Sequence, residues 1–166
     1  MTNILDDQLK AQLLDEARRI GDQLLADAQT DENGMSWETM GMDDKHATIF
    51  EKSEGIYGGV SGIALFLLEL SRKTGDDRYL EAAKEGMKWV VHRCKTVPND
   101  YYALFTGRLG VCMVLLRMYR ALEDKTYLEQ ALEVAKPLPE SLKVPMRVND
   151  ILNGGAGIVV GLIHLH

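Results

Sequence analysis

Three apolar runs, 63–70, 111–119 and 158–165, dominate the chain beyond residue 55. The first run is rich in Leu, Ala and Phe rather than Val and Thr, and it continues into the polar residues 71–73. This composition favours a helix over a buried strand. A helix that is apolar on nearly every side has to be buried on every side. The pattern therefore predicts three buried inner helices.

An amphipathic segment follows each of the first two runs, at about 78–93 and 127–135. Apolar residues recur there at steps of three and four, which places them on one face of a helix. They are Tyr79, Leu80, Ala83, Met87, Val90 and Val91 in the first segment, and Tyr127, Leu128, Ala131, Leu132 and Ala135 in the second. Each segment predicts an outer helix with one buried face, and Asp76 or Asp77 is available to cap the first.

The first 55 residues divide into a periodic and an aperiodic part. Residues 4–29 are predicted to form one long outer helix, because apolar residues recur on one face. These residues are Leu9, Leu13, Ala17, Ile20 and Leu24. Residues 30–55 show no sustained period, so we expect an irregular loop there. Its large apolar residues are expected to fold over another part of the chain. They are Trp37, Met40, Ile49 and Phe50.

A Gly-x-x-Gly motif precedes each apolar run. The three copies end at Gly62, Gly110 and Gly157, which are 48 and 47 residues apart. Tyr79 and Tyr127 also lie 48 residues apart. Such a period is typical of helical repeat proteins, in which each unit covers the apolar face of its neighbour. We therefore predict an all-α fold in which the chain is a single segment, part of an α/α toroid. The toroid has about 48 residues per pair of inner and outer helices, and the glycine repeats cover 56–166.

The motif glycines have two interpretations that are compatible with each other. They let a tight loop enter a crowded centre, because glycine has no side chain to clash. They also place the starts of the inner helices around a shared cavity, where free N–H groups suit an anionic or polar ligand. The candidate cavity residues are Gly59, Gly62, Gly107, Arg108, Gly110, Gly154 and Gly157. Arg108 either points into this cavity or pairs with an acid at its rim, and we favour the rim.

Composition and charge narrow the range of functions. The net charge is −6 and no Lys/Arg cluster occurs, which argues against binding to nucleic acid or to an anionic membrane surface. The start lacks a signal-peptide pattern and the apolar runs are too short to span a bilayer, so we expect a cytoplasmic protein. Cys94 and Cys112 lie 18 residues apart without CxxC or His spacing. We therefore expect no metal site in this stretch.

Several segments resemble the lanthionine synthetase C-like family. The segment from Leu152 to Leu162, which contains the third glycine motif, is similar to a signature of that family. The segments 56–68 and 105–111 resemble its earlier copies, and the turn 74–80 also fits. Motif, order and spacing agree over roughly residues 50–166.

The resemblance implies a toroid of inner and outer helices and, in the bacterial cyclases, a specific reaction. These enzymes join cysteine thiols of a precursor peptide to dehydroalanine or dehydrobutyrine, which gives a thioether ring. A zinc ion held by two Cys and one His stabilises the thiolate. Those ligands belong to the C-terminal half of the family, and neither Cys94 nor Cys112 matches them. We therefore expect no cofactor in this chain and zinc in the intact protein.

Asp150 is the one catalytic candidate that the resemblance provides. The family has an Asp shortly before the third glycine motif, implicated in acid–base chemistry or in orienting a catalytic His. Addition of a thiol to a dehydro residue leaves an enolate that must be protonated, and a positioned acid assists this step. The alternative is that Asp150 only caps the loop or the start of the helix.

Two other functions compete with that of a cyclase. A relative on the same fold could bind a peptide or a small thiol compound without forming a ring. A sugar epimerase or glycosidase built on an α/α toroid ranks third, since such proteins place paired carboxylates or His residues in the cavity. The expected partner is a precursor peptide or a small thiol ligand. The open apolar edge of a partial ring is also expected to favour self-association.

Overall fold

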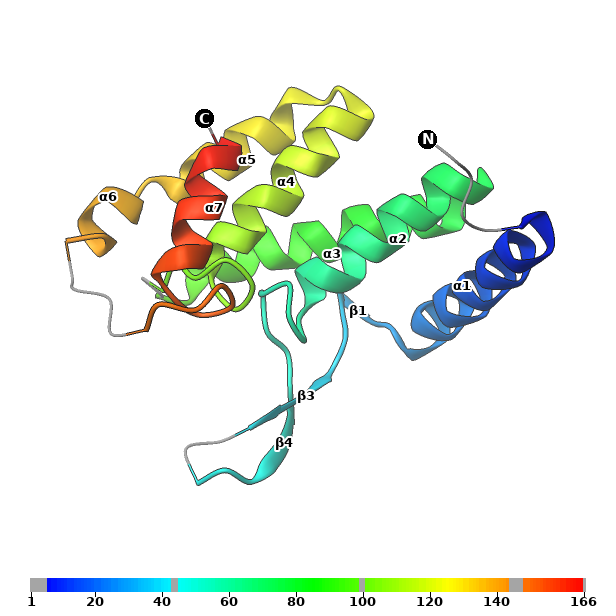
Figure 1. The fold of residues 1–166 in the computed structure, drawn as a ribbon, viewed down its shortest axis with the longest axis horizontal. Coiled ribbons are helices and arrows are strands. Elements are labelled where there is room, and N and C mark those ends of the chain that lie inside the picture. The colour runs from blue at the N-terminus through cyan, green and yellow to red at the C-terminus, as the bar shows by residue number, and fades with distance from the viewer. Residues whose placement is uncertain (1–5, 43–44, 99–100, 144–147, 166) are drawn as a thin grey trace.

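The computed structural model describes residues 6–42, 45–98, 101–143 and 148–165, and these residues are mostly helical (Figure 1). The helices are α1 (Asp7–Asp27), α2 (Val60–Thr74), α3 (Asp77–Thr96), α4 (Arg108–Leu122), α5 (Lys125–Ala135), α6 (Leu138–Ser141) and α7 (Gly155–Leu165). Four short strands lie between α1 and α2: β1 (Gln29–Asp31), β2 (Gly34–Ser36), β3 (Thr39–Met42) and β4 (Thr48–Glu51). The helical class predicted from the sequence is confirmed in this coarse form.

The helices beyond residue 59 pack in the order that the apolar pattern predicts. Helix α4 lies between α2 and α7, so the three helices that follow the glycine motifs are neighbours. Helix α3 packs along α2, α5 packs along α4, and α3 also contacts α5. The arrangement has an inner layer of α2, α4 and α7 and an outer layer of α3 and α5 (Figure 1).

The core lies mainly between these two layers. Its fully buried side chains include Leu67 and Leu68 of α2, Met87 of α3, and Leu115 and Met118 of α4. Burial of each such side chain contributes roughly 1.5–3 kcal/mol relative to exposure. The layer contact is therefore the main source of stability in this part of the chain.

Helix α7 departs from the expected burial on every side. Val159 and Ile163 are 57% and 69% exposed. Counted from the second glycine of each motif, Val159 corresponds to Ala64 in α2 and Cys112 in α4, which are both 0% exposed. Those two positions are buried because α3 and α5 pack along their inner helices. Among the described residues no such helix follows α7, so its outer face is apolar and open to solvent.

The two outer helices begin with the same type of N-cap. Asp76 accepts a hydrogen bond from the Arg78 amide at 3.0 Å, and Asp124 accepts one from the Thr126 amide at 2.9 Å. Hydrogen bonds from the Arg78 side chain and amide lower the pKa of Asp76, and the Thr126 amide lowers the pKa of Asp124. Of the two capping residues predicted for α3, Asp76 is therefore the one that forms the cap.

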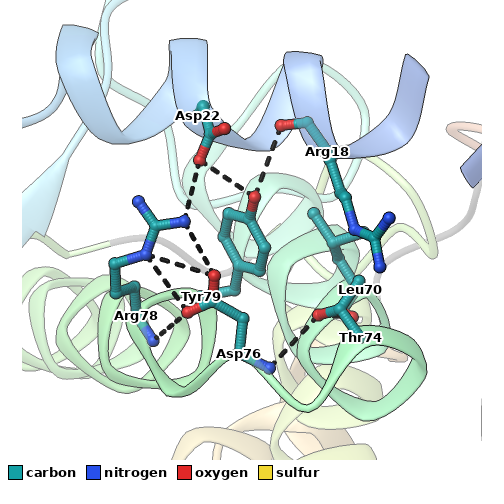
Figure 2. A network of polar contacts seen from close by, with 7 residues as sticks. All are labelled: Arg18, Asp22, Leu70, Thr74, Asp76, Arg78 and Tyr79. Carbon is teal, nitrogen blue, oxygen red and sulfur yellow. Dashed lines mark hydrogen bonds and ion pairs between the residues drawn. The ribbon is translucent and has the colours of Figure 1, made fainter. Parts of the chain in front are cut away.

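A polar network fastens α1 to the turn between α2 and α3 (Figure 2). The Tyr79 hydroxyl donates to Asp22 at 2.9 Å, and the Arg78 guanidinium bridges Asp76 at 2.7 Å and Asp22 at 3.3 Å. Gly21 allows the close approach, because a Cβ there would lie 2.5 Å from Leu70 Cδ2. The network fixes how α1 lies against the two-layer core.

The contact face of α1 differs from the predicted one. Ala17 and Leu24 pack against the core as expected, together with Leu14 and Leu25. The predicted contact residues Leu9, Leu13 and Ile20 are instead exposed. Helix α1 docks through Gly21, which is its buried residue. Because of this docking, the buried face of the helix is the one that carries Leu14. Residues 4 and 5 of the predicted helix 4–29 lie outside the described residues.

The prediction of an irregular loop at 30–55 is wrong, because this region contains two antiparallel hairpins. Strand β1 pairs with β2, with Thr30 opposite Met35, and β3 pairs with β4, with Met40 opposite Phe50. Strands of three or four residues are too short to show a sustained period. The Asn33-Gly34 pair is a hairpin signal, and Gly34 has a φ of +127°.

Only part of this region folds over the core. Trp37 is buried, and its Nε1 donates to the Leu24 carbonyl at 2.7 Å. Ile49 is partly exposed, whereas Met40 and Phe50 are largely exposed on the β3–β4 hairpin, which projects from the helices (Figure 1). The expected folding of all four residues over another part of the chain is therefore wrong for Met40 and Phe50.

Candidate functional site

The loops that precede α2, α4 and α7 are hydrogen-bonded to one another. The Ile56 and Tyr57 amides both donate to the Phe105 carbonyl at 2.8 Å. The Phe105 amide in turn donates to the Leu152 carbonyl at 3.2 Å. We call these three segments, 53–59, 101–107 and 148–154, the glycine loops. Their contacts gather the N-termini of the three inner helices at one end of the layer (Figure 1).

The second glycine of each motif is required by close backbone packing within its own loop. A Cβ at Gly62, Gly110 or Gly157 would lie 2.1, 2.2 or 2.1 Å from a carbonyl oxygen. In each case the oxygen belongs to the residue six positions earlier, which is Ile56, Leu104 or Ile151. The same contact in three loops supports the interpretation that these glycines admit a tight loop into a crowded space.

The first glycine of each motif is equally crowded. A Cβ at Gly59, Gly107 or Gly154 would lie 2.4–2.5 Å from a backbone atom of its own loop. Gly59 and Gly62 also line a cavity of about 480 Å³ beside α1 and β3. No described residue of the loops before α4 and α7 lines this cavity, so the predicted cavity shared by the three helix starts remains a prediction for all six motif glycines.

Arg108 pairs with an acid, as expected, but the location at a rim is wrong. Arg108 is only 6% exposed, and its Nη2 donates to the Val97 carbonyl at the end of α3. Its Nε lies 4.0 Å from Glu54 Oε1, while Arg93 Nε donates to Glu54 Oε2 at 2.9 Å. The cluster of Glu54, Arg93 and Arg108 therefore joins the first glycine loop to α3 and α4 inside the protein.

Asp150 fixes the turn of the third glycine loop. Its Oδ1 accepts hydrogen bonds from the Leu152 amide at 2.6 Å and the Asn153 amide at 2.7 Å. The residue is exposed, and Oδ2 makes no hydrogen bond with the described part of the chain. The capping role is thus present, and one carboxylate oxygen is left for another partner.

Asn153 connects this turn to the second glycine loop. Its Oδ1 accepts from the Thr106 hydroxyl at 2.6 Å, and its carbonyl accepts from the Tyr101 hydroxyl at 2.9 Å. Neither contact was predicted from the sequence, because the partners lie about 50 residues apart and carry no motif of their own. The repeat could have indicated the contact between Thr106 and Asn153, because both residues directly precede the first glycine of a motif.

The glycine loops also expose large apolar side chains. Tyr57, Tyr101, Ile151 and Leu152 all have substantial solvent exposure. Loop residues with exposed aromatic groups are common in binding sites, because aromatic side chains offer a large contact area. Sequence patterns did not single these residues out.

The two cysteines do not form a reactive or metal-binding pair. Cys112 is fully buried and Cys94 is partly buried. Burial raises the pKa of Cys94 from 9.0 to about 11 and that of Cys112 to about 12. In the described residues, no group of three or more His, Cys, Asp or Glu side chains could hold a metal ion.

The raised thiol pKa values predict slow alkylation. At pH 8 the thiolate fraction of Cys94, with a pKa of about 11, falls about a hundredfold below that of an ordinary thiol. Reaction of the native protein with iodoacetamide should therefore be at least about a hundredfold slower than in urea, and its rate should still rise between pH 8 and pH 10. Mass spectrometry of timed reactions gives both rates, and equal rates in buffer and urea would contradict the burial of the thiols.

These features define a mostly helical protein in which the three glycine loops meet at the N-termini of the inner helices. A family model described as lanthionine synthetase C-like protein matches residues 51–166. The chain belongs to the lanthionine synthetase C-like family, as the motifs predicted. No curated protein matches the chain significantly. Over the described ranges, no helix combines the length and apolar character needed to cross a membrane.

Proposed function

We propose that the chain supplies the peptide-binding end of a lanthionine synthetase C-like cyclase on an α/α toroid. In this reaction a cysteine thiol of a bound peptide adds to dehydroalanine or dehydrobutyrine and forms a thioether. One observation carries the proposal: the three glycine loops are hydrogen-bonded into a single surface that presents Asp150. Membership of the family supports the same reaction.

The chemistry of the loop surface suits an extended peptide. Exposed Tyr57, Tyr101 and Leu152 offer apolar contact to a peptide. The first amides of the inner helices are not part of this offer, because Val60, Arg108 and Gly155 donate to carbonyl groups of their own loops. The loops hold these groups without long side chains that would need ordering on binding. A pre-organised surface of this kind lowers the entropy loss of association.

Asp150 is proposed to move the proton of the reaction. The sulfur of the peptide cysteine forms a bond to Cβ of the dehydro residue, and the π electrons of the double bond move to Cα and the adjoining carbonyl. Oδ2 of Asp150 takes the thiol proton and returns it to Cα, so that no atom is gained or lost. Oδ1 holds the carboxylate in place through the Leu152 and Asn153 amides.

The residues of this chain do not fit the zinc site of the family. The described residues offer no three-residue ligand set, and both thiols are buried with raised pKa values. Zinc, when bound in the family's cyclases, stabilises the attacking thiolate. We assign no ligand and no step through the metal to this chain, and zinc in the intact protein remains an expectation.

The second candidate is a module that binds a peptide or thiol compound without catalysis. The exposed side chains of Tyr57, Tyr101 and Leu152 favour binding, and this function needs no group that moves a proton. It would use the same loop surface. A binding assay and a chemical assay on one peptide therefore separate the two functions.

The test uses a fluorescent peptide with one cysteine and one dehydroalanine, and a matched peptide with alanine in place of the dehydro residue. We expect saturable binding of the first peptide by fluorescence anisotropy. Replacing Tyr57 and Tyr101 together by serine should weaken it at least about tenfold, which equals about 1.4 kcal/mol. The control variant Leu132→Ser, which removes an exposed apolar residue on α5, should bind normally.

The reaction is then followed with the intact zinc-loaded protein by the loss of the free cysteine thiol of the peptide. Mass cannot report it, since ring formation does not change the peptide mass. Asp150→Asn should slow this loss at least about tenfold, within the usual range for a general acid or base, with little effect on affinity. Asp124→Asn, which alters a similar cap at α5, is the matched control. Binding without thiol loss would favour the non-catalytic module, and no binding to either peptide would contradict both functions.

A further inference from the structure

A cavity of about 410 Å³ lies between the inner helices α2, α4 and α7. Its walls are mainly apolar, with Leu65 from α2 and Met113 and Leu116 from α4. Neither Asp150 nor any motif glycine lines it. The volume lies within the usual range of small-molecule sites, roughly 300–1,000 Å³. Ile56 of the first glycine loop is its only contribution from the glycine loops among the described residues, so the cavity lies mainly along the inner helices and is large enough for a ligand.

Each inner helix places an ionisable residue in this cavity at the same position of the repeat. Glu69, Arg117 and His164 all line it, and each is the seventh residue after the second glycine of its motif. The inner helices are otherwise almost uniformly apolar over the runs that contain these residues. The side chains of Glu69 and Arg117 are 39% and 38% exposed and His164 is exposed, so this polar edge of the cavity is open to water and accessible to a ligand.

The charges in the cavity do not cancel. Arg117 Nε donates to Glu69 Oε1 at 2.5 Å, and Arg72 also pairs with Glu69 at 2.9 Å. The bond from Arg117 is the main cause that lowers the pKa of Glu69. Arg120 also lines the cavity, and in the structure as described it makes no ion pair. Two guanidinium groups thus face one carboxylate, and the cavity has an excess of positive charge.

We propose that this cavity binds a small organic carboxylate with an apolar body, such as a medium-chain fatty acid. The carboxylate lies at Arg120 and Arg117, whose planar groups suit bidentate hydrogen bonds to it. The hydrocarbon body lies against Leu65, Met113 and Leu116, which remove its apolar surface from water. The proposal does not depend on the thioether chemistry, because no residue assigned to that reaction lines the cavity.

The test compares decanoate with decan-1-ol, which has the same chain length and no charge. The methyl resonance of Met113, followed by NMR during titration, reports binding at this site. Decanoate should cause a saturable shift of this resonance. It should also bind at least about tenfold more tightly than decan-1-ol, because only decanoate makes a charge-assisted hydrogen bond. Equal affinities, or no shift at Met113, would overturn the proposal.

Variants with opposite expected effects separate a ligand site from a change in folding. Arg120→Gln should weaken decanoate binding at least about tenfold and leave decan-1-ol unchanged, since only the carboxylate uses the guanidinium. Glu69→Gln should tighten decanoate binding, because it removes the competing carboxylate. Lys73→Gln, on α2 outside the cavity, is the control and should have no effect. Loss of decanoate binding in all three variants would contradict the assignment.

Discussion

Replacing Gly110 by alanine is expected to lower the free energy of unfolding by about 2 kcal/mol or more. The new Cβ would lie 2.2 Å from the Leu104 carbonyl oxygen and 3.0 Å from Ile56 Cδ1, so the second glycine loop would have to move. Alanine is the better helix former by about 1 kcal/mol, which opposes the clash without removing it. Urea unfolding followed by circular dichroism measures the difference between the variant and the natural chain.

Gly155 provides the matched control for this experiment. It begins α7, and a Cβ there would find its nearest atom, Asn149 Oδ1, at 3.8 Å, which is ordinary contact. Gly155→Ala should therefore change stability by less than about 1 kcal/mol, in either direction. Equal destabilisation by the two substitutions would show that the close packing of the loop is not the reason for glycine at position 110.

Replacing Glu54 by glutamine is expected to lower the free energy of unfolding by about 3 kcal/mol. The Glu54 side chain is 10% exposed and lies 2.9 Å from Arg93 Nε and 4.0 Å from Arg108 Nε. Glutamine keeps the shape of the side chain but removes its charge. Arg108 is then left as a buried cation without a carboxylate partner, which is the costly outcome when a buried ion pair is broken.

Glu133→Gln tests whether this effect requires burial. Glu133 pairs with Lys136 at 3.6 Å, and both side chains are largely exposed. Exposed pairs of this kind contribute between 0 and about 1 kcal/mol, so the control variant should unfold nearly as the natural chain does. If urea unfolding gave the same small change for both variants, the cluster around Glu54 would have no special role in stability.

The repeat explains why the helices could be predicted from the sequence. Gly62, Gly110 and Gly157 mark three starts of inner helices, and the amphipathic residues around Tyr79 and Tyr127 mark two outer ones. A local period of three and four residues is a property of one helix, so it is visible without knowledge of its neighbours. The hairpins at 29–51 escaped prediction because strands of three or four residues contain too few positions to establish a period.

Contacts between distant segments could not be read from the pattern in the same way. The spacing of three and four residues predicted Leu9, Leu13 and Ile20 as part of the contact face of α1, but docking at Gly21 determines which face is buried. Arg108 is a similar case. Its motif suggested a rim, whereas its partner Glu54 is buried and lies in another loop of the sequence.

The candidate site was predictable only where the family resemblance reached it. Asp150 could be named from its place before the third motif, and its cap of the Leu152 and Asn153 amides was one of two stated alternatives. The exposed Tyr57 and Tyr101 could not be named, because an aromatic residue in a loop gives no sign of its exposure. The three-dimensional contact of the glycine loops is what brings these residues to one surface.

Hydrogen exchange of the loop amides tests most directly whether the three glycine loops form one peptide-binding surface. The measurement compares the protein alone with the protein saturated by the peptide that carries cysteine and dehydroalanine. We expect slower exchange in all three glycine loops together, and unchanged exchange in α5 and the β3–β4 hairpin. Protection of a single loop, or protection confined to the cavity between α2, α4 and α7, would contradict the proposed site.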